Sequence, residues 1–173
     1  MSRHIVLVGL PGAGKTSVGK AVAQELGASF VDADLLIEER VQASISEIFM
    51  DRGESWFRAL ERETVQEIVS RPDACVVAPG GGWAAQPGNI TDVGERALTI
   101  HLLVSPEEAA ERTAHSFHRP LLDGKEPEDA IRELWAVRKS YYDASELKVD
   151  TSERDAADVA REVAALARTH GGW

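Results

Sequence analysis

The stretch GLPGAGKT occupies residues 9–16 and directly follows the apolar run Ile5 to Val8. Its spacing, G-x-x-x-x-G-K-T, is typical of a phosphate-binding loop between a strand and a helix. Glycines let the backbone curl round a phosphate chain with its N–H groups pointing inward, and the following helix N-terminus adds a partial positive charge. We expect nucleotide contacts from Gly12, Ala13, Gly14, Lys15, Thr16 and Ser17.

Two side chains of this motif indicate a nucleoside triphosphate. Lys15 supplies a mobile positive charge for the β- and γ-phosphates, and the Thr16 hydroxyl is a hard oxygen suited to Mg²⁺. The sequence therefore predicts that the protein binds ATP with Mg²⁺, although binding alone does not identify a reaction.

Beyond the loop, short apolar runs alternate with longer segments of helical period. Runs that are apolar throughout suit strands buried on both faces of a parallel sheet, and their alternation with helices predicts a three-layer α/β/α sandwich. Ligands should gather at the carboxyl ends of the strands. The expected strands are 4–8, 29–31, 75–78, 98–104 and 147–149, and the expected helices are 15–26, 46–70 with a break near Gly53, 106–113, 128–143 and 155–169.

Composition limits the class of protein. The 173 residues, 43% of them hydrophobic, predict one domain over residues 1–173. The formal charge of −10 opposes binding to nucleic acid or to an anionic membrane. Cys75 is the one cysteine, so no intrachain disulfide can form, and it lies in an apolar run that indicates the core. With no long apolar segment either, we expect a cytoplasmic protein.

The end of the second strand carries two carboxylates, Asp32 and Asp34. At a strand terminus beside the phosphate loop, one can hold Mg²⁺ through water and the other can accept a hydrogen bond from a nucleophilic hydroxyl. The alternative is an acidic turn that caps a helix over 35–40, which is a common use of aspartate.

Two arginines lie on the apolar faces of their helices. Helical periodicity places Arg58 and Glu61 in the stripe of the helix near 54–70, and it places Arg138 in the stripe of the helix near 128–143. A buried arginine needs a partner, and Glu61 can serve Arg58, whereas no acidic residue in its own stripe serves Arg138. Either these are structural charges, or they converge on an anionic group such as a carboxylate.

Three further segments are candidates for the site. Gly80, Gly81 and Gly82 follow the third strand and expose backbone N–H groups to a ligand. The polar segment 112–125 is either a solvated loop or a mobile lid in which Arg119 delivers charge to the transition state. Residues 150–155 lead into the last helix, where Arg154 is expected to flank an adenine.

Together, the motifs GLPGAGKT, DAD, GESWFRALE, GGG, RPLL, an arginine ahead of a tyrosine, and DTS resemble the shikimate kinase family over nearly the whole chain. The resemblance implies a P-loop kinase fold with a five-stranded parallel sheet in the order 2-3-1-4-5 and substrate-binding helices at about 33–62. It also implies transfer of the γ-phosphate of ATP to the 3-hydroxyl of shikimate, in a pathway that leads to aromatic amino acids. We expect a monomer.

The resemblance further implies a role for each site residue. Lys15 and Thr16 would hold phosphate and Mg²⁺, with Asp32 near the metal and Asp34 orienting or deprotonating the hydroxyl. The shikimate pocket would be formed by Arg58, Glu61, Gly80, Gly81, Gly82 and Arg138, whereas Arg119 would be the lid arginine and Arg112 would lie by the adenine.

The sequence departs from the family pattern at two places. Trp83 follows the glycines where small or aliphatic residues are usual, and Lys139 and Ser140 follow Arg138 before the tyrosine pair. Two alternatives remain open, namely a kinase for another small hydroxylated acid such as gluconate, and a nucleotide-binding regulator without catalytic activity.

Overall fold

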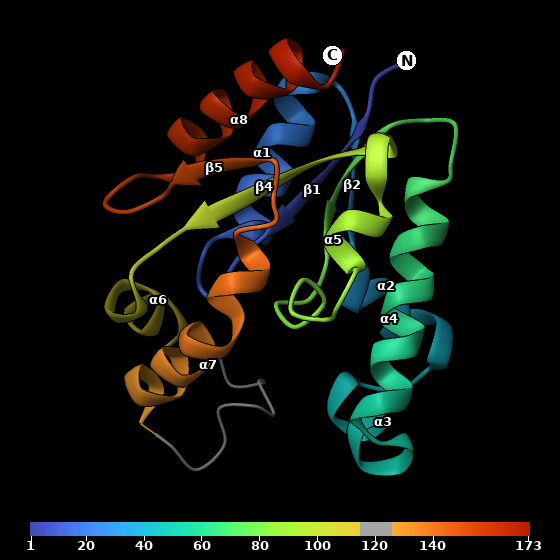
Figure 1. Cartoon of the computed structure of the whole chain (residues 1–173), viewed down its shortest axis with the longest axis vertical. Helices are drawn as coiled ribbons and strands as arrows, with labels where there is room; N and C mark the ends of the chain where they lie inside the picture. The colour runs from blue at the N-terminus through green and yellow to red at the C-terminus, as the bar shows by residue number, and fades with distance from the viewer. Residues whose placement is uncertain (115–125) are drawn as a thin grey trace.

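A five-stranded, all-parallel sheet forms the centre of the molecule, in the order β2-β3-β1-β4-β5 (Figure 1). The computed structural model describes residues 1–114 and 126–173. The strands are β1 (His4–Val8), β2 (Ser29–Asp32), β3 (Cys75–Ala78), β4 (Ala97–Leu103) and β5 (Leu147–Asp150). The expected fold class and strand order are confirmed.

The helices within the described residues include those expected from the sequence and others that it did not predict. They are α1 (Lys15–Leu26), α2 (Ala33–Val41), α3 (Ile45–Arg52), α4 (Glu54–Val69), α5 (Asn89–Asp92), α6 (Pro106–Thr113), α7 (Pro127–Tyr142) and α8 (Ala156–His170), with a 3₁₀ turn at Gly94–Arg96. The break near Gly53 divides α3 from α4 as expected, because Gly53 adopts a φ of 82° that other residues rarely take. Helix α5 was not predicted, since its four residues are too few for a periodic pattern.

The helices lie on both faces of the sheet. Helices α1 and α8 pack together on one face, and α4 and α5 stand on the other (Figure 1). Strand β1 runs through the middle of the sheet and is buried along its whole length, which explains why its sequence is apolar rather than alternating. Cys75 is buried in this core as expected.

A second, smaller apolar cluster lies away from the sheet. It consists of Ile37 from α2, Ile48 from α3 and Phe57 from α4, each at most 2% exposed. Ser44 begins α3 with a capping box in which its hydroxyl and the Glu47 carboxylate each accept a backbone N–H. These contacts fix α2, α3 and the first turns of α4 as one unit beside the carboxyl ends of β1, β2 and β3.

None of the helices in the described ranges is both long enough and apolar enough to cross a lipid bilayer.

Candidate functional site

A cavity of about 990 Å³ opens at the carboxyl ends of β1, β2 and β3. Most of the residues predicted for the site line it together, although they come from distant parts of the sequence. These lining residues are Gly12, Gly14, Lys15, Thr16, Ser17, Asp32, Asp34, Arg58, Glu61, Gly80, Gly81, Gly82, Arg112 and Arg138.

The phosphate-binding loop has a backbone that only glycine tolerates. Gly12 and Gly14 have φ values of 84° and 90°, and a Cβ on Gly12 would lie 2.5 Å from the Ala109 carbonyl oxygen. Helix α1 begins at Lys15 with no side chain capping it, so its first N–H groups face the cavity end of the loop. Ala13 differs from its neighbours, because it is fully buried and its N–H donates to the Leu10 carbonyl.

Lys15 folds back over its own loop. Its ammonium donates hydrogen bonds to the carbonyl oxygens of Gly9 at 2.8 Å and Leu10 at 3.0 Å. These bonds hold the positive charge above the loop, at the wall of the cavity.

Thr16 and Asp32 bring two oxygens together at the wall of the cavity. The Thr16 hydroxyl donates to Asp32 Oδ2 at 3.3 Å, while Asp32 Oδ1 accepts the backbone N–H groups of Asp34 and Leu35. Asp32 therefore caps α2, as the alternative interpretation of these carboxylates predicts. Its second oxygen, Oδ2, lies beside the Thr16 hydroxyl. A hydroxyl and a carboxylate fit Mg²⁺, which usually takes only one or two protein oxygens alongside phosphates and water. In line with this, the described residues contain no cluster of three or more histidine, cysteine or acidic side chains that could hold a metal alone.

The half-buried carboxylate of Asp34 and the fully buried carboxylate of Glu61 meet at Gly80. A Cβ on Gly80 would lie 2.6 Å from Glu61 Oε1 and 2.9 Å from Asp34 Oδ1, so only glycine fits there. Neither of these two oxygens has a hydrogen-bond partner within the described residues.

Burial governs the ionisation of both carboxylates. Burial, assisted by the negative charge of Asp32, raises the pKa of Asp34 to about 6, although Lys15 and Arg58 act in the opposite direction. Burial likewise raises the pKa of Glu61 to about 7, with Arg58 as the main opposing charge. Titration near neutral pH is typical of groups that exchange protons in an active site.

Arg58 and Arg138, the two arginines predicted for the site, both line the cavity. Arg58 donates from Nη1 to Glu61 Oε2 at 2.8 Å, as expected from their spacing, and Arg138 is buried with 6% exposure. Within the described ranges no salt bridge involves Arg138. The two arginines line the same cavity, and of the two only Arg58 forms a salt bridge with a described residue.

The segment Gly80 to Gly82, called the glycine loop below, lies against both arginines. A Cβ on Gly82 would lie 2.4 Å from Arg58 Nη2, and a Cβ on Gly81 would lie 3.0 Å from Arg138 Nη1. Trp83, which departs from the family pattern, is 1% exposed and packs into the core. Trp83 is absent from the lining of the cavity, so its indole does not narrow the pocket.

No role in the site was predicted for Tyr142, the second residue of the tyrosine pair, yet its hydroxyl donates to the Gly81 carbonyl at 2.9 Å. Its ring also packs on His101, with centroids 4.9 Å apart, and burial lowers the pKa of that histidine to about 4. The signal that could have identified Tyr142 is its place one turn after Arg138 on the same face of α7.

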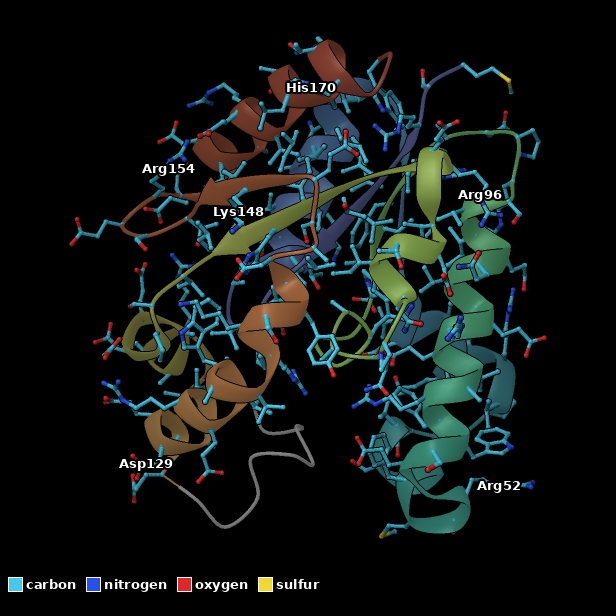
Figure 2. The ribbon with its side chains drawn as sticks, in the orientation of Figure 1. Arg52, Arg96, Asp129, Lys148, Arg154 and His170 are labelled. Carbon is cyan, nitrogen blue, oxygen red and sulfur yellow. The ribbon has the colours of Figure 1, made fainter. Side chains whose placement is uncertain are left out.

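The two arginines predicted for the nucleotide end have different surroundings. Arg112 donates to the Gly12 carbonyl at 3.2 Å and to the Thr151 carbonyl at 2.8 Å, so it ties the phosphate-binding loop to the turn after β5. Arg154 is not a lining residue of the cavity, because its guanidinium bonds to Asp150 and to Glu162 on α8. Figure 2 shows Arg154 beside α8, far from α2 and α4.

The predicted lid falls almost entirely outside the described residues. The structure describes only residues 112–114 of the expected lid. Arg119 and the rest of 115–125 lie outside the described residues.

The chain is similar to known proteins over nearly its whole length. The family model for shikimate kinase matches residues 11–168. The shikimate kinase of Moorella thermoacetica is 40% identical over 163 residues, which cover 94% of this chain and 93% of that relative.

Solved structures show the same likeness. The shikimate kinase of Acinetobacter baumannii, in complex with shikimate, superposes with a TM-score of 0.90 at 34% identity, and the match covers 98% of this chain and 94% of that one. A gluconokinase from Sinorhizobium meliloti gives a TM-score of 0.63 at 17% identity, with 99% and 94% covered, which is a likeness of fold alone.

Proposed function

The chain belongs to the shikimate kinase family, and we propose that its 990 Å³ cavity is where the γ-phosphate of ATP passes to the 3-hydroxyl of shikimate. The protein is an ATP-dependent kinase, and the product is shikimate 3-phosphate. The observation that carries the site assignment is the meeting of Arg58, Arg138 and Asp34 with the phosphate-binding loop in one cavity.

On the phosphate side, the backbone of 12–17 and the Lys15 ammonium bind the phosphates of ATP. Thr16 would hold Mg²⁺ directly and Asp32 would hold it through water, and the bound ion supplies positive charge to the phosphate oxygens. Lys15 would leave the carbonyl oxygens of Gly9 and Leu10 for the β- and γ-phosphates, which accept its hydrogen bonds more strongly because they are charged.

On the acceptor side, Asp34 orients the hydroxyl and accepts its proton. Asp34 Oδ1 is buried and has no partner within the described residues, so an incoming hydroxyl would satisfy it. A carboxylate whose pKa is raised to about 6 is a stronger base than an exposed aspartate and is still ionised at neutral pH.

The substrate carboxylate pairs with the two arginines. Arg58 and Arg138 present planar forks that match a carboxylate, and burial makes each hydrogen bond stronger than it would be in water. Gly80, Gly81 and Gly82 allow Glu61, Arg138 and Arg58 to lie against the backbone, because a side chain at any of the three positions would collide with one of them. Glu61 contributes by holding Arg58 at 2.8 Å.

At the nucleotide end, we propose that Arg112 lies beside the adenine, where its bonds to Gly12 and Thr151 would keep its guanidinium plane in place. Arg154 supports the loop over 150–155 through its bond to the Asp150 carbonyl at 2.8 Å. Arg119 remains a proposal from the sequence, in which it delivers positive charge to the transition state from a lid over 112–125.

The test is an ADP-release assay with shikimate, quinate and gluconate as acceptors and Lys15→Ala as the blank. Shikimate should give the highest kcat/KM, and Lys15→Ala should abolish turnover because the transferring phosphate loses its nearest charge. A preference for gluconate would support the kinase of another hydroxylated acid. ADP release from none of the three acceptors would support a regulator.

Further proposals concern the protein as a whole. We propose that residues 1–173 act as one domain and that the protein works as a monomer, because this one chain supplies the residues proposed for both ATP and shikimate. We also propose a cytoplasmic location, since the phosphoryl donor ATP is available there. We expect no nucleic acid or membrane partner, given the net charge of −10.

A further inference from the structure

Glu61 on α4 is a buried carboxylate with very little support for its charge. Its side chain is 0% exposed, and its Oε2 accepts one hydrogen bond, from Arg58 Nη1 at 2.8 Å. Its Oε1 has no hydrogen-bond partner anywhere in the described ranges. A buried carboxylate is usually stabilised by several donors or by a dedicated cation, whereas Arg58 is the one hydrogen-bond donor to Glu61 among the described residues.

The other charged groups around Glu61 do not replace Arg58. Asp34 faces Glu61 across Gly80 and disfavours its charge, whereas Arg138 from α7 favours it more weakly than Arg58 does. Lys15 acts on the neighbouring Asp34, and Glu54 competes for the same arginine. In this balance burial dominates and raises the pKa of Glu61 to about 7.

Arg58 is shared between Glu54 and Glu61, so its positive charge is divided between two carboxylates. Its Nη2 already lies 3.3 Å from the exposed Glu54, and the guanidinium is confined by the ring of Phe57, 5.3 Å away, and by Gly82. If the substrate carboxylate also pairs with this guanidinium, the ion pair presents less net positive charge to Glu61. Among the residues that the structure describes, Glu61 has no second hydrogen-bond donor, so its neutral form becomes more favourable.

We propose that the binding of shikimate is coupled to the uptake of a proton by Glu61. The proton comes from solvent and forms an O–H bond on one carboxylate oxygen, so the bound state holds the substrate carboxylate, two arginines and a neutral Glu61. This inference rests on the proposed function, because it requires an anionic group at Arg58.

The sign of the pH dependence follows from linkage. Below about pH 6 Glu61 is already protonated in the free protein, so it takes up no proton on binding and adds no pH dependence to the affinity. Above about pH 7 the free protein is ionised at Glu61, and binding must first protonate it. The dissociation constant for shikimate should then rise, by up to about tenfold per pH unit, until the bound form also ionises.

Calorimetric titration of the full chain with shikimate tests the proposal. The measurement is made at about pH 6 and about pH 8, each in phosphate and in a buffer of large ionisation enthalpy such as Tris or Bis-Tris. The difference in heat between buffers gives the number of protons taken up. We expect this number to approach one at about pH 8 and to lie close to zero at about pH 6.

Two variants locate the proton. Glu61→Gln keeps the size of the side chain but cannot titrate, so its proton uptake at about pH 8 should be close to zero. Glu54→Gln is the matched control, because it removes the exposed carboxylate from the same arginine, and it should retain the uptake of the parent protein.

Several outcomes would overturn the proposal. Shikimate binding at about pH 8 with no buffer dependence in the parent protein excludes the coupling, and this measurement decides even if Glu61→Gln does not fold. Undiminished uptake in a folded Glu61→Gln assigns the proton to another group. A parent protein that does not bind shikimate at all refutes the proposed function itself, which is a different result from binding without proton uptake.

Discussion

The substitution Arg138→Ala tests the carboxylate site most directly. Arg138 lies on α7 with 6% exposure, and among the described residues it forms no salt bridge. The cost of removing its charge from water is therefore incurred in the free protein. We expect a large part of that cost to be recovered only when an anion binds.

The size of the effect follows from this burial. Truncating one partner of a buried, hydrogen-bonded charge pair costs about 2 to 5 kcal/mol, and each 1.4 kcal/mol corresponds to about tenfold in affinity. Arg138→Ala should therefore raise the KM for shikimate by about 30-fold to about 4,000-fold. The KM for ATP should change little, because the phosphate-binding loop joins β1 to α1 and contains no residue of α7. Arg138→Lys should recover little, since an ammonium cannot reproduce the planar fork.

The assay is steady-state ADP release with each substrate varied in turn. Arg132→Ala provides a matched control on the same helix, because Arg132 is 51% exposed and pairs with Glu107 and Glu128 at the surface. That variant should keep both KM values of the parent. If Arg138→Ala binds shikimate as the parent does, the carboxylate role is wrong and Arg138 is a structural charge. If the KM for ATP rises equally, the reasoning that separates the two ends of the cavity fails.

The remaining predictions concern ionisation, the glycine loop and a helix cap. Burial raises the pKa of Asp34 to about 6, so the base is lost on acidification and kcat/KM for shikimate should fall about tenfold per pH unit below about pH 6; a rate that stays constant to about pH 5 contradicts this. Gly82→Ala would bring a Cβ within 2.4 Å of Arg58 Nη2 and should raise the KM for shikimate about tenfold or more without changing that for ATP, as the same assay would report. Asp155 caps α8 by accepting the Asp158 N–H at 2.8 Å, so Asp155→Ala should lower the free energy of unfolding in urea by about 1 kcal/mol and leave kcat unchanged.

The sequence determined the fold class because local signals agreed with one another. Uniformly apolar runs such as Ile5 to Val8 indicate strands covered on both faces, and the motif over 9–16 places a glycine turn between one such strand and a helix. The break at Gly53 and the pairing of Arg58 with Glu61 also follow from short-range rules, namely glycine conformation and helical periodicity. Each of these features depends on residues close together in the chain.

The sequence could not decide which distant groups meet. Periodicity placed Arg138 on the inward face of its helix, but only the packing of α7 beside the sheet brings it to Gly81, and only that packing lets the Tyr142 hydroxyl reach the Gly81 carbonyl at 2.9 Å. Arg154 shows the same limit, since its position after β5 predicts a place beside the adenine, but only the packing of α8 gives its guanidinium Glu162 as a partner.

The ionisation of Asp34 and Glu61 likewise belongs to the tertiary structure. Both are ordinary acidic residues in the sequence, and their pKa values are raised to about 6 and about 7 because the folded chain removes them from water and places them against the same glycine. Desolvation depends on every atom packed around a group, and these atoms come from α2, α4, α7 and the loop after β3. A local pattern can therefore name the carboxylates, but only the assembled cavity sets the pH at which each one exchanges its proton.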